Sequence, residues 1–262
     1  MIKQARRMNL DSDAVLREAV DRIALANKLT QSRRNFLRGS LTLGGLSMLT
    51  GCVLDDHASI EAALGNISRV NDTVQGLLFD PNRLAPTYPD SMITRPFPFN
   101  AFYAESEVVE VDEEDYELEV AGMVSNKKKW TLPELRAMPQ EDQITRHICV
   151  EGWSAIGKWG GVPFASFLKQ IGADTTAKYV GFKCADDYFT SIDMPTAMHP
   201  QTLLALTYDG QVLPPKYGFP MKLRMPTKLG YKNPKHIQAI FVTNTYPGGY
   251  WEDQGYNWFG GS

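Results

Sequence analysis

The sequence lacks the cysteine and histidine patterns with which a chain holds a metal or a disulfide by itself. It has three widely spaced cysteines, Cys52, Cys149 and Cys184, which form neither a disulfide framework nor a CxxC zinc pattern. Its four histidines show neither an HExxH motif nor a close pair. A zinc site built from side chains alone is therefore not expected.

The sequence also lacks an excess of positive charge and a long apolar run. A net charge of −3 and a pI near 5.8 give no electrostatic footprint for nucleic acid. The apolar stretch over residues 41–50 is too short to cross a bilayer as a permanent helix. With 262 residues and 43% hydrophobic content, the chain can bury one large core or two small ones.

The N-terminal part carries a pattern typical of an export signal. The run SRRNFLR over residues 32–38 matches the twin-arginine pattern, and the short Gly- and Ser-containing apolar stretch follows it. The alternative is an amphipathic helix with a chance arginine pair. Because the twin-arginine route carries folded proteins, typically around an inserted cofactor, this pattern hints at a cofactor and at a periplasmic location.

Residues 49–52, LTGC, resemble a lipoprotein cleavage box that would make Cys52 a lipid anchor. We divide the chain into an N-terminal polar helical extension (1–31), the signal with its possible lipobox (32–52), a Pro-rich approach segment (53–98) and one catalytic domain (99–262). The 32 residues that precede Arg33 make the signal longer than usual, which leaves a later start or a retained segment open.

The central segment TRHICVEGW, residues 145–153, places one cysteine where a β-like run breaks at Gly152. Apolar Ile144 and Ile148 alternate with His147 and Cys149, so a period of two puts His147 and Cys149 on the face opposite the isoleucines. A thiolate there is a candidate metal ligand or nucleophile. The alternative is a small buried hydrophobe, which is the usual role of a free cysteine.

The rest of the domain predicts short strands with few helices. Residues 108–111 and 116–120 read as strands, and a capping box at Thr131 opens a helix through Met138. Pro163 begins a second helix that ends at Gly172. Hairpins are expected over 179–192 and 203–213. This order favours a β-rich α+β fold over a doubly wound sheet.

A basic stretch near the C-terminus suggests an anion site. Lys222 and Arg224 alternate with apolar residues in a strand-like run, and they would point to the same side. The alternative is a solvated strand face. The run continues into a loop, residues 227–236, that carries three further lysines between Gly and Pro, which suits phosphate recognition.

Four stretches together resemble the sulfite-oxidase fold of molybdopterin oxidoreductases, and most closely its methionine-sulfoxide-reductase branch. They are NAFY at 100–103, CVEGWS at 149–154 with WGGVP at 159–163, AKYVGF at 177–182, and LPPKYGFP at 213–220 running on to Lys235. The resemblance covers residues from about Asn100 to Trp251. It implies the β-rich sulfite-oxidase fold and Mo-molybdopterin as cofactor.

The resemblance also implies roles for individual residues. Cys149 corresponds to the thiolate ligand of molybdenum. The pocket would include Asn100, Tyr103 and Cys184, with Tyr103 beside the reacting centre. The residues that would face the pterin and its phosphate are Tyr217, Lys222, Asn233 and Lys235. The branch has threonine, asparagine and arginine where this chain has Cys184, Tyr217 and Lys222, and the lysine lacks the forked guanidinium that the branch's arginine offers a phosphate.

The implied activity is two-electron oxygen-atom transfer, in the direction that reduces a small-molecule or protein-bound S-oxide or N-oxide. Electrons would come from a membrane haem protein of the cytochrome b type. The first alternative is a sulfite dehydrogenase that passes electrons to a cytochrome c. The resemblance speaks against it, because this chain has Phe99 at the position where sulfite oxidases have an arginine. The second alternative is a lipid-anchored binding protein without catalysis.

The lipobox prediction can be checked on the exported protein. We expect mass spectrometry of the mature chain to find Cys52 as its first residue, with an acyl-bearing modification. The Cys52→Ser variant should lose the modification and the membrane fraction. An unmodified N-terminus at another residue would contradict the lipid anchor.

Overall fold

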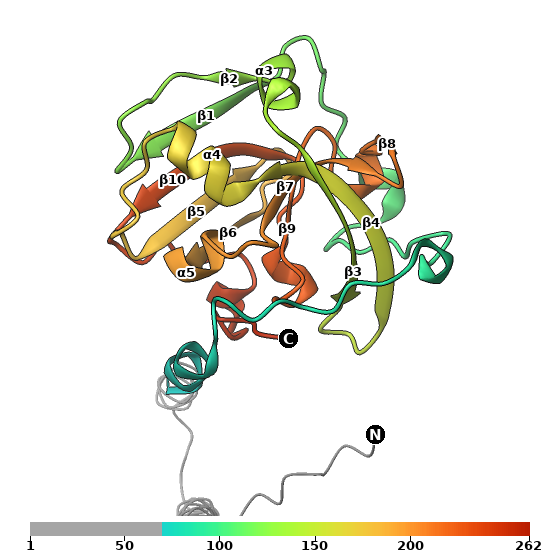
Figure 1. The fold of residues 1–262 in the computed structure, drawn as a ribbon, viewed down its shortest axis with the longest axis horizontal. Coiled ribbons are helices and arrows are strands. Elements are labelled where there is room, and N and C mark those ends of the chain that lie inside the picture. Colours follow the sequence, from blue (N-terminus) through green and yellow to red (C-terminus); the bar gives the residue numbers. More distant parts are fainter. Residues whose placement is uncertain (1–69) are drawn as a thin grey trace, which may run out of the picture. The chain divides into compact units, whose positions relative to one another are not determined.

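The computed structural model describes residues 70–262, and the predicted signal and Cys52 lie outside this range. Residues 70–78 form a helix that precedes the sheets. Two five-stranded sheets form the framework of the described chain, with short helices at their edges (Figure 1). The predicted β-rich α+β class is confirmed.

The first sheet is mixed and has the strand order β2-β1-β10-β5-β6. Its strands are β1 (Glu117–Gly122), β2 (Trp130–Thr131), β5 (Tyr179–Cys184), β6 (Phe189–Asp193) and β10 (Ile237–Thr243). β1 and β10 run parallel, and the other neighbours are antiparallel. The predicted 179–192 hairpin is therefore present as β5 and β6.

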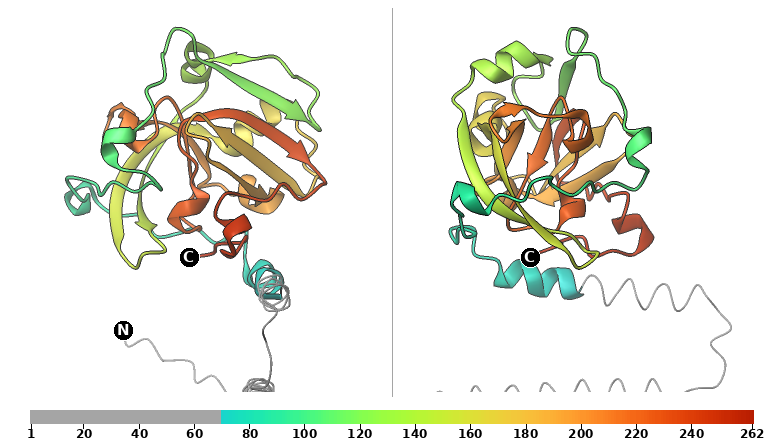
Figure 2. Two further views of the ribbon diagram at one scale, coloured as in Figure 1. Left: turned by 180° about the vertical axis from the view of Figure 1, so that it is seen from behind. Right: turned by 90° about the vertical axis from the view of Figure 1, so that its right-hand side faces the viewer.

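The second sheet is antiparallel and contains the Cys149 segment. Its strands are β3 (Glu141–Ile148), β4 (Ser154–Pro163), β7 (Leu203–Tyr208), β8 (Gln211–Val212) and β9 (Lys222–Arg224), with β8 and β9 both paired to β7. The long β3–β4 hairpin, drawn in yellow-green, curves along one side of the domain in both further views (Figure 2).

Short helices begin where the sequence provides caps. α3 (Leu132–Ala137) has the predicted Thr131 capping box, and α4 (Phe164–Gln170) follows Pro163. The remaining helices are α5 (Met194–Ala197) and the 3-10 turns η1 (Asp90–Met92), η2 (Glu105–Glu107), η3 (Pro215–Tyr217), η4 (Gly230–Lys232) and η5 (Glu252–Gln254).

Both faces of the second sheet are covered, which explains its continuous apolar run at residues 203–206. Leu204 and Leu206 pack into the main core, with α4 and the first sheet. Leu203 and Ala205 face a second cluster on the other side, which contains Trp159. The sheet thus separates two apolar volumes and leaves its loop ends to form a site.

Two local predictions differ from the structure. Residues 154–163 form the ten-residue strand β4, which the glycines at 157, 160 and 161 concealed in the sequence. Residues 108–111 form no strand, because this segment has no sheet neighbour and Glu110 is exposed. Among the described residues, none of the helices combines the length and the apolar character needed to cross a membrane.

The pairing of β4 with β7 requires a glycine at position 161. A Cβ on Gly161 would lie 1.9 Å from the Leu204 carbonyl oxygen. We expect Gly161→Ala to lower the free energy of unfolding by about 3 kcal/mol, measured by urea titration, because the backbone of a packed strand must move. Gly76→Ala is the matched control. Its Cβ meets only an ordinary contact at 3.9 Å in a helix, so it should be neutral or stabilising by up to about 1 kcal/mol. Equal effects would contradict the close approach.

Candidate functional site

The turns at one end of the two sheets enclose a cavity of about 130 Å³. The segment 100–102, the turn after β3, the β5–β6 turn, the loop after β9 and two aromatic residues near the C-terminus contribute to its wall. The lining residues are Asn100, Ala101, Phe102, Cys149, Val150, Glu151, Asp186, Tyr188, Gly230, Tyr231, Asn233, Pro234, Lys235, Trp251 and Tyr256. The cavity therefore joins stretches that lie far apart in the sequence.

Cys149 lies at the start of the turn that follows β3, with its sulfur at the cavity. Its N–H donates to the Trp153 carbonyl at 2.9 Å, which closes the turn. Its Sγ lies 3.6 Å from Glu151 Oε2, and the Trp153 indole N–H donates to the same oxygen at 2.8 Å. Burial raises the pKa of the Cys149 thiol, and the Glu151 charge adds to the rise. A thiolate here therefore requires a nearby cation, such as a metal.

Three cationic side chains are buried at or behind the cavity wall, and only Lys235 among them lines the cavity. Lys222, Arg224 and Lys235 are 1%, 0% and 8% exposed, and none forms an ion pair with an acidic residue of the described chain. Lys228 and Lys232, which are equally buried, lie beside Asp193 and Glu252. Burial lowers the pKa of Arg224 to about 9 and of Lys235 to about 8. The pKa of Lys222 falls well below its usual value for the same reason, and Lys235 and Arg224 lower it further. This arrangement needs an anion.

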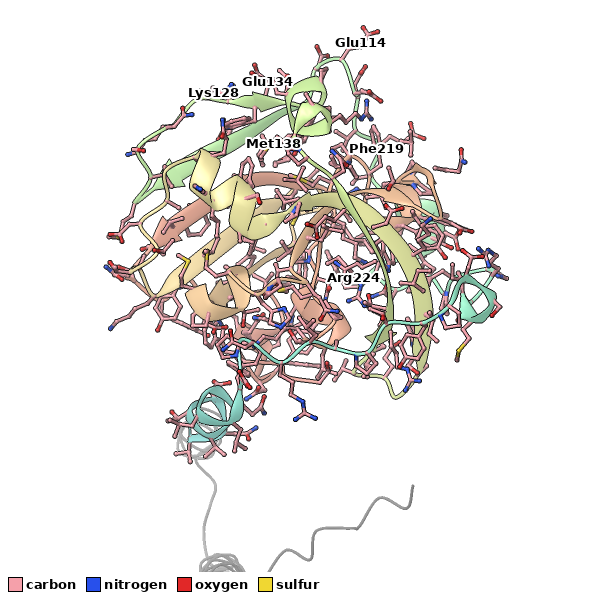
Figure 3. All side chains as sticks on the ribbon, in the orientation of Figure 1. Glu114, Lys128, Glu134, Met138, Phe219 and Arg224 are labelled. Atoms are coloured by element: carbon pink, nitrogen blue, oxygen red, sulfur yellow. The ribbon has the colours of Figure 1, made fainter. Side chains whose placement is uncertain are left out.

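Arg224 points from β9 toward β3 in the interior of the domain (Figure 3). Its guanidinium donates to the Arg146 carbonyl at 2.6 Å, the Thr145 hydroxyl at 3.2 Å and the Asn233 side-chain oxygen at 3.2 Å. The predicted strand with its two cations is present, but all of it is buried. The solvated-face alternative is therefore wrong.

Asn233 and Lys235 hold the loop after β9 against the rest of the site. The Asn233 side-chain oxygen accepts from the Met225 N–H at 2.6 Å, and its amide donates to the Leu229 carbonyl at 2.9 Å. The Lys235 ammonium donates to the carbonyls of Asn100 at 2.5 Å and Lys216 at 2.9 Å. These contacts come from backbone dipoles, and Lys235 forms no ion pair within the described chain, although the charges of Asp186 and Glu105 partly offset the fall that burial causes in its pKa.

The remaining predicted residues surround the cavity at different depths. The Tyr103 hydroxyl donates to Asp186 Oδ2 at 2.9 Å, so it reaches the cavity wall through Asp186. Cys184 is buried at the end of β5 and does not line the cavity. Tyr217 donates its hydroxyl to the Phe97 carbonyl at 2.8 Å within the second core cluster. Lys222 also lies behind the wall, 5.0 Å from the Trp159 ring centre.

His147 lies on the same buried side of β3 as Cys149, as the period of two predicts. Neither of its ring nitrogens has a hydrogen-bond partner in the described chain, although the ring is fully buried. A Cβ on Gly230 would lie 2.7 Å from its Nε2 and 3.6 Å from the Asn100 amide nitrogen. Burial lowers the pKa of His147 well below its usual value, and the cations at 222, 224 and 235 add to this.

These features fit a phosphate-bearing polar cofactor. Uncompensated cations suit a phosphate dianion. Buried polar atoms without partners, at His147 and the Arg224 Nε, suit a ligand with donors and acceptors. The absence of a side chain at Gly230 leaves room for such a ligand beside Asn100. The residues present therefore fit the molybdopterin group that the resemblance implies.

Sequence reasoning gave too little weight to three residues. Asp186 lies in the turn of the hairpin expected over 179–192, and the structure shows in addition that it lines the cavity. His236 carries no recognisable motif, yet it is fully buried and contacts Tyr103. Arg224 was noted for its strand face only. The one signal that the sequence offered for Arg224 was its place between Leu223 and Met225 in a largely apolar run.

Comparisons with known proteins identify the family. Residues 105–251 match the model of the oxidoreductase molybdopterin binding domain. The chain is 68% identical, over 99% of both chains, to a protein of Azospira oryzae named "Putative protein-methionine-sulfoxide reductase subunit YedZ1". It is 32% identical over 161 residues to the protein-methionine-sulfoxide reductase catalytic subunit MsrP of Ralstonia nicotianae, covering 55% of this chain and 49% of that one. It thus spans about half the length of this relative.

The fold is similar to a solved structure of the same broad class. The sulfane dehydrogenase SoxCD of Paracoccus pantotrophus superposes with a TM-score of 0.50 and 20% sequence identity, over 53% of this chain and 40% of that one. The predicted sulfite-oxidase-like fold is confirmed by this likeness together with the family match.

The buried cations predict how stability depends on pH in the cofactor-free protein. The folded-state pKa of Lys235 is about 8, below its unfolded value of 10.5, so the unfolded chain binds more protons between these values. Stability is therefore lost as the pH falls toward 8, and we expect a rise of about 1 kcal/mol between pH 7 and pH 9 from this lysine. Urea titrations at both pH values measure the rise.

Two variants and one added ion complete this test. Lys235→Met should reduce the rise by about 1 kcal/mol, whereas Lys129→Met should leave it unchanged, because Lys129 is an exposed lysine paired with Glu117. Inorganic phosphate should raise the melting temperature of the wild type at pH 7 more than sodium chloride at equal ionic strength. A stability that falls between pH 7 and pH 9 would contradict the uncompensated charge.

Proposed function

The chain belongs to the oxidoreductase molybdopterin binding domain family, and on that basis we propose that it is an exported reductase of S-oxides. It is a molybdopterin-dependent oxidoreductase, and its cofactor is Mo-molybdopterin. The observation that carries the proposal is the cavity itself, which Cys149 and Lys235 both line, while Lys222 and Arg224 are buried without an ion pair to an acidic residue of the described chain. The name of the Azospira relative supports the substrate class.

The chain's own residues have distinct roles in this proposal. Cys149 would provide the single protein thiolate to the metal, since soft sulfur ligands suit molybdenum chemistry. Lys222, Arg224 and Lys235 would bind the cofactor's phosphate. The pterin would lie against Asn100 and Asn233, which line the cavity, whereas Tyr103, Cys184 and Tyr217 would support the wall from outside it. When bound, the metal supplies the exchange of one oxygen atom and two electrons.

The cavity wall favours a neutral substrate. Its aromatic part comes from Phe102, Tyr188, Tyr231, Trp251 and Tyr256, which exclude water. Two carboxyl side chains, Glu151 and Asp186, also face the cavity. Carboxylates repel an oxyanion at short range, so the wall supports a small S-oxide or N-oxide, methionine sulfoxide among them, over sulfite.

Phe99 adds to this preference. Its ring lies 4.7 Å from the Lys235 ammonium, so an aromatic face covers a cation that could otherwise attract an oxyanion. The sulfite dehydrogenase alternative, with cytochrome c as electron acceptor, therefore has weaker support. The site gives no support to the alternative of a non-catalytic binding protein, and metal analysis is the measurement that tests it.

Location and electron partner complete the proposal. The twin-arginine pattern supports export of the folded enzyme to the periplasm, and the lipobox supports an anchor at Cys52. A membrane haem protein of the cytochrome b type would then deliver electrons at the membrane surface. Both parts rest on the sequence, because residues 1–69 lie outside the described chain.

The decisive experiment uses the purified exported chain from cofactor-competent cells. We expect about one molybdenum per chain and turnover of S-oxides with reduced viologen as donor, within a panel that also holds N-oxides and sulfite. Cys149→Ser should lose turnover by at least about 100-fold, because the serine hydroxyl is a harder and weaker ligand than a thiolate.

Cys184→Ser is the matched control, because it changes the other described cysteine to the same residue and should retain molybdenum. A wild type with less than a tenth of an equivalent of molybdenum would reject the proposal. Sulfite-dependent reduction of cytochrome c without S-oxide turnover would instead support the first alternative. Cys149→Ser with unchanged metal and turnover would support the second.

A further inference from the structure

The hydroxyl of Tyr103 lies between two groups that can each accept its proton. It donates to Asp186 Oδ2 at 2.9 Å and lies 3.4 Å from His236 Nε2. The other ring nitrogen of His236, Nδ1, is 2.6 Å from the Phe219 carbonyl oxygen. Because a carbonyl only accepts, Nδ1 carries the proton of a neutral ring and Nε2 is an acceptor.

Counting protons shows that this arrangement can hold one more. Tyr103 has a single hydroxyl proton, but an ionised Asp186 and the His236 Nε2 both face it as acceptors. One additional proton, on either Asp186 or His236, gives every contact a donor and an acceptor. The Asp186–Tyr103–His236 row is therefore a hydrogen-bonded store with room for one proton.

The row has one end at the cavity and the other in the interior. Asp186 lines the cavity, whereas His236 is fully buried and does not line the cavity. The row is also held in place by the backbone. Asp186 Oδ1 accepts from the Tyr188 N–H at 3.3 Å, and the His236 carbonyl accepts from the Ala185 N–H at 2.9 Å. A proton that leaves the row toward substrate must therefore leave through Asp186.

The surrounding groups keep the tyrosine and the histidine in their neutral forms. Burial raises the pKa of Tyr103, and the charges of Asp186 and Cys184 raise it further. Burial lowers the pKa of His236. The Phe219 hydrogen bond and Asp186 oppose that shift, while Lys235 and Lys222 add to it. The groups that face the row are Cys184, Tyr188, Lys222 and Lys235. A proton added to the histidine of the row is therefore released readily.

We propose that the Asp186–Tyr103–His236 row stores a proton and passes it through Asp186 to the oxygen that leaves the substrate. This inference rests on the proposed S-oxide reduction. The overall change is an S-oxide plus two electrons and two protons giving a thioether and water, with cleavage of the S–O bond and formation of two O–H bonds. The row supplies one proton, solvent at the cavity mouth supplies the second, and the haem-protein donor class supplies the electrons. Asp186 then takes a proton back from solvent.

Asp186→Asn tests the row in the molybdenum-loaded full chain. The amide keeps the shape and still accepts from Tyr103, but it cannot hold or release the proton. We expect kcat for an S-oxide to fall about 100-fold with KM changed less than about threefold, as for the loss of a general acid. The molybdenum content should stay unchanged. Asp187→Asn is the control, since Asp187 is exposed and does not line the cavity.

The pH profile and chemical rescue separate proton delivery from a structural role. The wild-type kcat should fall on the alkaline side as the row loses its extra proton, and Asp186→Asn should lose this limb. Added formate should raise the activity of Asp186→Ala at least about tenfold, because a free carboxylic acid can replace the missing side chain. An Asp186→Asn enzyme with wild-type kcat and pH profile, a loss that formate does not restore, or loss of molybdenum would each overturn the proposal.

Nitrogen NMR of histidine-labelled full chain tests the row without turnover. His236 should be the Nδ1–H tautomer at neutral pH. Its protonation midpoint should fall by about one unit or more in Asp186→Asn, because an opposite charge no longer favours the imidazolium. An Nε2–H tautomer would overturn the row. A wild type that binds molybdenum but reduces no S-oxide rejects the proposed function, whereas an S-oxide reductase unaffected by Asp186→Asn rejects only the row.

Discussion

Positive charge buried without a carboxylate is the constraint on which the site depends. Lys222, Arg224 and Lys235 are buried at or behind the cavity wall, and the last two donate only to backbone carbonyls, an amide oxygen and the Thr145 hydroxyl. Desolvating an ammonium or a guanidinium costs several kcal/mol that such dipoles repay in part. The same domain pairs Lys232 with Glu252 at equal burial, so acids are available to this fold. The unpaired trio is therefore explained by a ligand that brings the negative charge.

The sheets position Cys149 and the cations at or behind the wall of one cavity. The β3–β4 hairpin ends in the turn that carries Cys149, and β9 supplies two of the cations from a strand paired with β7. The loop after β9 then returns to the cavity with Asn233 and Lys235. Because strands are stiff and close-packed, the distance between the two ends of the site is fixed by register rather than by a mobile loop.

Local patterns in the sequence predicted most elements, and the resemblance predicted which ends of them meet. Alternation located β1 and β5 to β9, and the Thr131 box located α3, because these signals lie within a few residues. The strand β4 was missed because Gly157, Gly160 and Gly161 are unusual in strands, and only its packing explains them. At Gly160 and Gly161 a Cβ would meet Thr207 and Leu204 of β7. Such close approaches depend on partners more than forty residues away.

The roles of buried residues were harder to predict, because burial is a property of the fold. The alternation of Lys222 and Arg224 with apolar residues was compatible with a solvated strand face, but both side chains are buried in the structure. Tyr217 and Lys222 lie behind the wall, although the resemblance implies contact with the cofactor. Asp186 differs from these two residues, because it lies in a turn and yet lines the cavity. Its side chain accepts from Tyr103, which also contacts His236. Two charged systems thus share this small cavity. The buried cations favour a ligand that carries negative charge, whereas Glu151 at the cavity wall disfavours a second anion beside it, and this combination supports the proposed neutral oxide as substrate.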